Sequence, residues 1–166
     1  LHTEVHSFPT RRSSDLNRHS EVIEKIARNL GITATFADAT PDAPLPERGI
    51  MDSRADNQLC GHLLVRRWGR DTLQGVRRVV KDWCLDRLET IYLYLPLIEP
   101  ATAVSCGKLE EQGFFFSGIM PGQKGADNLI LQFLNNQRYD YSSLQAATPF
   151  GKALIDYVRR CDPDAG

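Results

Sequence analysis

The sequence lacks a strong excess of either charge and any long apolar run. Its 20 basic and 21 acidic residues leave a formal net charge of -1, so no global field draws the chain to nucleic acid or to an anionic membrane. The longest apolar stretches, residues 91–98 and 114–120, are much shorter than the roughly 20 residues that span a bilayer. We therefore expect neither a nucleic-acid-binding protein nor a membrane protein.

The sequence also lacks close pairs of cysteines. Cys60, Cys84, Cys106 and Cys161 are widely separated, with no C-x-x-C spacing and no neighbouring histidine pair to complete a zinc site. Each has apolar neighbours, which favours small buried thiols in a reducing compartment over disulfides. We expect a cytoplasmic protein without a bound metal.

The length and composition of the chain are typical of one globular domain. The chain has 166 residues, 42% of them hydrophobic and 25% charged, which suits a single hydrophobic core. Residues 1–16 have neither a helical nor a strand period, and SFPTRRSSDL within them resembles translated sequencing-adapter read-through. We therefore expect residues 1–16 to be an extraneous or disordered leader, and residues 17–166 to be a single domain cut from a longer chain.

Hydrophobic periodicity predicts helices and strands in a regular succession. Helices are expected over residues 20–30, 71–88, 100–112 and 149–160. Strands are expected over residues 32–37, 49–55, 58–68, 90–98, 114–120 and 128–134. Three prolines within residues 38–48 predict an exposed loop. The order predicts an α/β domain with a mixed, mostly antiparallel sheet flanked by helices.

This element order, together with the segment KLEEQGFFFSGIMP at residues 108–121, resembles the GNAT N-acetyltransferase family. In that family a helix ends in a glycine and an aromatic residue, here Gly113 and Phe114, before the last two strands. The resemblance covers about residues 32–135 and implies that the first strand of the fold is missing. The run from Tyr92 through LPLIEP to ILQFLNN is also similar to the GNAT-like module that ends bacterial ATPase-containing anti-sigma-type regulatory proteins.

The resemblance implies a phosphate-binding turn. GNAT enzymes hold the pyrophosphate of acyl-CoA on a Q/R-x-x-G-x-G/A turn at a helix N-terminus, where free N–H groups and the helix dipole favour anions. Its counterpart here implies cofactor-binding roles for Arg66, Arg67, Gly69, Arg70 and Thr72. The last position departs from the motif, because it is Asp71. We expect this carboxylate to cap its own helix and to occupy the donors that a phosphate needs.

No residue can be assigned to catalysis. Many GNAT enzymes carry a proton-donating tyrosine four residues before the glycine, and that position is Leu109, which has no proton to donate. His62 is taken as the only histidine of the folded body. In the predicted strand it shares a face with Cys60 and Leu64, which predicts a structural role. Phe114, Phe115 and Phe116 are expected in the core.

Three carboxylates, Asp52, Glu99 and Asp127, could serve as a base, but no spacing pairs them with a nucleophile.

Two functions therefore stay open. The first is a non-catalytic GNAT-like module of a bacterial regulatory protein that binds a small-molecule ligand or a neighbouring domain and needs no cofactor. The alternative is an active N-acetyltransferase that uses acetyl-CoA.

Overall fold

The computed structural model describes residues 16–56, 59–123 and 126–165, so the predicted leader lies outside the described residues except for Leu16. Leu16 opens the short 3-10 helix η1 (Leu16–His19) and is only 2% exposed. The packed part of the chain therefore includes one residue that the sequence analysis assigned to the leader. No helix within the described residues is long and apolar enough to cross a membrane.

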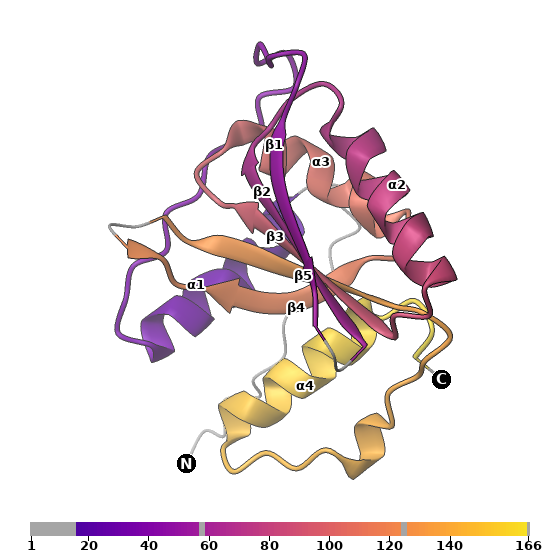
Figure 1. The fold of residues 1–166 in the computed structure, drawn as a ribbon. Helices are drawn as coiled ribbons and strands as arrows, with labels where there is room; N and C mark the ends of the chain where they lie inside the picture. The colour runs from indigo at the N-terminus through magenta and orange to yellow at the C-terminus, as the bar shows by residue number, and fades with distance from the viewer. Residues whose placement is uncertain (1–15, 57–58, 124–125, 166) are drawn as a thin grey trace.

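Five strands form one sheet in the order β1-β2-β3-β5-β4 (Figure 1). Their bounds are β1 (Ile50–Ala55), β2 (Cys60–Arg67), β3 (Thr90–Pro96), β4 (Phe115–Met120) and β5 (Asn128–Leu134). The pair β2 and β3 is parallel, and the other three pairs are antiparallel. The predicted mixed, mostly antiparallel sheet is confirmed.

Four helices flank this sheet, as predicted: α1 (Ser20–Asn29), α2 (Thr72–Leu85), α3 (Pro100–Glu110) and α4 (Pro149–Cys161). α2 links the parallel strands β2 and β3, and α3 carries the chain onward in the same direction along the sheet. Right-handed crossovers place both on one face, where Figure 1 shows them together. α1 and α4 pack near the edge strand β4, and η3 (Tyr141–Ser143) precedes α4.

The two faces of the central strands differ in burial. Alternate residues Leu63, Ile91 and Leu93 are fully buried, as period-2 alternation requires, and Phe114, Phe115 and Phe116 are buried as predicted. On the other face, residues of β2 and β3 are only half-buried.

The strand predicted over residues 32–37 does not form. Ile32 N bonds back to Ala27 O at the end of α1, and Ala37 N bonds to Leu97 O just after β3. β3 already pairs with β2 on one side and β5 on the other, so it has no free edge for a ladder. Ala34 and Phe36 still pack on the core, which explains the strand-like alternation in the sequence.

Candidate functional site

The candidate phosphate-binding turn joins the end of β2 to the start of α2, as predicted. Every amide from Gly69 to Thr72 is already hydrogen-bonded. Gly69 N donates to Thr72 Oγ1 (2.8 Å), and Thr72 N donates to Gly69 O (3.1 Å). Arg70 N donates to Pro46 O (2.9 Å), and Asp71 N donates to Glu47 O (3.3 Å). A phosphate at these amides would have to displace bonds within the protein.

The prediction that Asp71 caps its own helix is wrong. Asp71 occupies the N-cap position, but its side chain makes no capping bond. Its Oδ1 instead accepts a hydrogen bond from Gly49 N (2.7 Å). The carboxylate therefore fastens the segment before β1 to the turn. Carbonyls of that segment fill two of the four amide donors, and atoms of the turn itself fill the other two.

Residues 46–49 lie directly against the turn because two glycines meet there. A Cβ on Gly69 would stand 2.1 Å from Gly49 N and 2.3 Å from Arg48 C. A Cβ on Gly49 would stand 2.3 Å from Thr72 Oγ1. Such distances are far inside van der Waals contact, so glycine at both positions is what allows the carbonyls of Pro46 and Glu47 to reach the amides.

Trp68 occupies the place where the two parallel strands separate. β2 and β3 pair only as far as Leu64 and Tyr94; beyond these residues β2 continues with β1 and β3 with β5. Crevices outside the carboxyl ends of parallel strands are where sheets of this kind commonly bind ligands. Here Trp68, 2% exposed, follows β2 at once and begins a hydrogen-bonded link to β3.

Thr102 completes that link. Trp68 Nε1 donates to Thr102 Oγ1 (2.8 Å), and Thr102 Oγ1 donates to Pro96 O at the end of β3 (2.7 Å). The indole thus bridges the diverging strand ends and is held by a side chain in the first turn of α3.

Two hollows lie near the Trp68 side chain. One, of about 260 Å³, lies between the proline-rich loop, Trp68 and the first turns of α2 and α3, and includes Arg70, Leu73 and Lys108 in its lining. The other, of about 540 Å³, is a groove between α2 and α3 whose lining includes Leu73, Arg77 and Lys108. They share Leu73 and Lys108, so they adjoin. Their cations can attract an anionic group, against the opposing charge of Glu111 in the larger groove.

The residues predicted to bind a cofactor are not all gathered here. Arg70 faces the smaller hollow, and Gly69 and Thr72 are buried inside the turn. Arg66 points away to form an ion pair with Asp52 on β1 (Nε–Oδ2 2.6 Å), and Arg67 is exposed at the end of β2.

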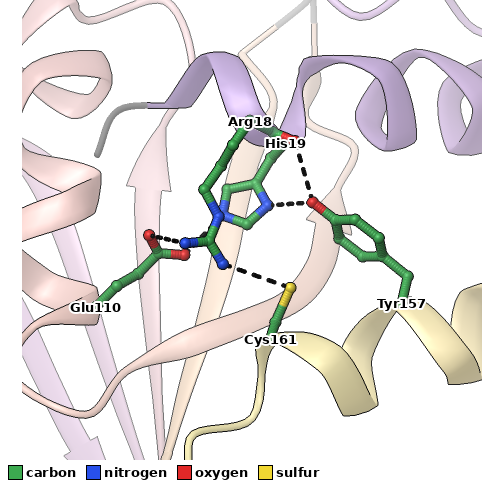
Figure 2. Close-up of polar contacts among 5 residues, drawn as sticks. All are labelled: Arg18, His19, Glu110, Tyr157 and Cys161. Atoms are coloured by element: carbon green, nitrogen blue, oxygen red, sulfur yellow. Dashed lines mark hydrogen bonds and ion pairs between the residues drawn. The ribbon is translucent and has the colours of Figure 1, made fainter. Parts of the chain in front are cut away.

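A second polar group, absent from the sequence analysis, is buried between η1, α3 and α4 (Figure 2). His19, fully buried, places Nδ1 2.6 Å from Tyr157 Oη and Nε2 2.7 Å from Glu110 Oε1. Arg18 Nη1 lies 3.2 Å from Glu110 Oε2, and Arg18 Nη2 lies 3.7 Å from Cys161 Sγ. The group ties three segments distant in sequence to one another.

A neutral His19 fits the two contacts of its ring. With its proton on Nε2, the imidazole donates to the Glu110 carboxylate and accepts from the Tyr157 hydroxyl. The Tyr157 oxygen also lies 3.2 Å from Arg18 O, a second acceptor for the same proton. Burial lowers the pKa of His19, against the opposing effect of Glu110, and Arg18 lowers it further. Burial also raises the pKa of Tyr157, so the phenol keeps its proton. The carboxylate–imidazole–phenol order resembles a catalytic relay, but Tyr157 is only 3% exposed and cannot meet a substrate.

A ring nitrogen of His19, Cys106 Sγ and a Glu110 carboxylate oxygen form a candidate metal-binding group, because these atoms lie within 4.8 Å of one another. However, His19 Nε2 and Glu110 are already at hydrogen-bond distance. The Arg18 cation beside Glu110 also adds positive charge where an ion would sit. The arrangement favours a hydrogen-bonded network over a bound cation.

His62, the histidine considered as a general base, lies on the half-buried face of the sheet. Its Nδ1 is 2.9 Å from Tyr94 Oη, and its ring stacks near Tyr92 and Tyr94. The assumption that His62 is the only histidine of the folded body is wrong, because His19 is packed as well. His19 immediately precedes the first predicted helix, and this position was the one signal that could have drawn attention to it.

The three candidate bases are spread over the molecule. Asp127 is 3% exposed and accepts from Gly122 N (2.9 Å). Asp52 pairs with Arg66, and Glu99 precedes α3. None of these contacts joins a carboxylate to a nucleophile within the described residues.

Comparisons with known proteins give a loose structural likeness. No protein-family model matches the sequence, and no curated protein matches it. Among solved structures, the chain is similar to the ribosomal-protein-S18-alanine N-acetyltransferase from Escherichia coli, with 13% identity and a TM-score of 0.38 over 64% of this chain and 71% of that chain. At this TM-score the likeness carries no inference about activity.

Proposed function

We propose that this chain is a GNAT-like module that binds a small ligand or a neighbouring domain without transferring an acetyl group. The GNAT-like part is supported by the strand order, by the parallel pair that separates at its carboxyl ends, and by the Gly113–Phe114 junction. A setting within a bacterial, cytoplasmic regulatory protein of the anti-sigma type belongs to the same proposal.

The absence of acetyl transfer rests on one observation: the turn into α2 is occupied by the protein itself. Its four amides are bonded to Pro46 O, Glu47 O and the turn's own atoms, and Trp68 fills the adjacent gap between strand ends. An acyl-CoA diphosphate could accept hydrogen bonds from these amides only by displacing the bonds that they already make. Leu109, in place of a tyrosine, is also fully buried.

The alternative, an active acetyl-CoA-dependent N-acetyltransferase, is favoured by the cations Arg70, Arg77 and Lys108 beside the two hollows. In that case the diphosphate would bind along α2 and α3 instead of at the turn.

Isothermal titration calorimetry of the whole chain with acetyl-CoA separates these functions. We expect no saturable binding by the natural sequence. In Asp71→Gly we expect weak binding to emerge, since the change removes a negative charge and the anchor of Gly49. Asp42→Gly makes the same substitution in the neighbouring loop and should leave binding absent. Micromolar binding by the unmodified chain, with acetyl transfer to a peptide amine, would establish the alternative instead.

A further inference from the structure

The outer edge of β1 is exposed and self-complementary in charge. β1 is the first strand of the sheet, and within residues 16–56, 59–123 and 126–165 it pairs only with β2. All of its residues except Met51 are exposed. An edge of this kind presents unpaired N–H and C=O groups to which another strand can be added.

The side chains of β1 restrict which strand can be added. Asp52 and Arg54 lie opposite Leu64 and His62 of β2, and because they are two residues apart they project from the same face. Asp52 pairs with Arg66 through one oxygen, and a carboxylate can accept further bonds. Arg54 is exposed and forms no ion pair within the described part of the chain.

A second copy of β1, running antiparallel about a two-fold axis at Ser53, matches these charges. Asp52 then lies opposite the second copy's Arg54, and Arg54 lies opposite the second copy's Asp52, which makes two favourable cross-strand pairs. On the other face, Met51 lies opposite Ala55. A two-fold axis at Asp52 or at Arg54 would instead set like charges against each other. Among two-fold axes at Asp52, Ser53 and Arg54, the axis at Ser53 is the one that sets opposite charges against each other.

We propose that this chain self-associates through the outer edge of β1, with Ser53 on the two-fold axis. The contact is the same on both copies, so it closes at a dimer. Six residues offer much less area than the roughly 800 Å² per partner of a standard interface, so the dimer forms only at high protein concentration. Its ion pairs are exposed, and salt weakens it. This inference does not depend on the proposed function.

Sedimentation equilibrium of the whole chain over a concentration series tests the register. Arg54→Asp places Asp52 opposite a second Asp in both pairs, and Asp52→Arg places two arginines together. We expect each change to lower the association constant about tenfold or more. The triple variant Asp52→Arg/Arg54→Asp/Arg66→Asp restores opposite charges across the two-fold axis and also between positions 52 and 66, so association should return to within about threefold of the starting value.

Arg28→Asp, on an exposed residue of α1, makes the same charge change away from β1 and should leave association unchanged. Circular dichroism verifies that each variant is folded, and a salt titration of the unmodified chain gives a second measurement. A chain that stays monomeric at every concentration would overturn the proposal. So would association that survives both single changes, that the triple change fails to restore, or that 0.5 M salt leaves unaffected.

Discussion

The buried His19 network makes the stability of this protein depend on pH. Because burial lowers the pKa of His19 from its ordinary value of 6.5, the unfolded chain takes up a proton more readily than the folded chain. The stabilisation is therefore present above pH 6.5 and is lost as the pH falls from 6.5 towards the folded-state pKa. One proton limits the slope to about 1.4 kcal/mol per pH unit.

Replacing His19 by glutamine should remove this dependence. Glutamine can still donate to Glu110 and accept from Tyr157, but it does not titrate. The imperfect fit of two bonds of 2.6 and 2.7 Å should cost about 1–3 kcal/mol at pH 7. Urea denaturation at intervals between pH 5 and 7.5 measures both effects.

His62→Gln provides the matched control, since the His62 side chain is 32% exposed and lies on the opposite face of the sheet. We expect His19→Gln to lose the part of the slope that comes from His19, and His62→Gln, which leaves the His19 contacts intact, to retain it. If the two variants and the natural sequence all show the same slope below pH 6.5, His19 does not carry the pH dependence and the assigned neutral state is wrong.

Two further changes test the occupied turn. Trp68→Ala should lower the free energy of unfolding by about 3–5 kcal/mol, as for a large buried aromatic residue. Trp68→Phe should lower it less, because phenylalanine keeps most of the packing. Thermal denaturation of the two variants tests this order. Gly69→Ala sets a methyl group against the backbone of Arg48 and Gly49, so we expect a loss of several kcal/mol, or release of residues 46–49 detectable as faster amide hydrogen exchange. Gly31→Ala is its control, because a Cβ there meets nothing within 4 Å and its positive φ should cost only about 1 kcal/mol; equal losses at the two glycines would contradict the close contact.

The sequence by itself determined the secondary structure around the site, because helix and strand periods, caps and prolines are local properties. Thr148 shows this plainly: it directly precedes the helix predicted over residues 149–160, and its side chain caps α4 by accepting from Gly151 N (3.0 Å). The turn into α2 was likewise placed correctly between β2 and the helix. What Asp71 does there was not, because its partner, Gly49, lies 22 residues away along the chain.

Only the tertiary structure decided which acceptors bond the amides of the turn into α2, and which distant side chains contact one another. Residues 32–37 have the alternation of a strand, yet they form none. Ile32 N is bonded to Ala27 O at the end of α1, and Ala37 N is bonded to Leu97 O beside β3, which already has two neighbours. His19, Glu110 and Tyr157 are separated by as many as 138 residues, and no local pattern marks them as partners. Periodicity reports how a side chain relates to its own segment, whereas hydrogen-bond partners across the core depend on how distant segments pack against one another.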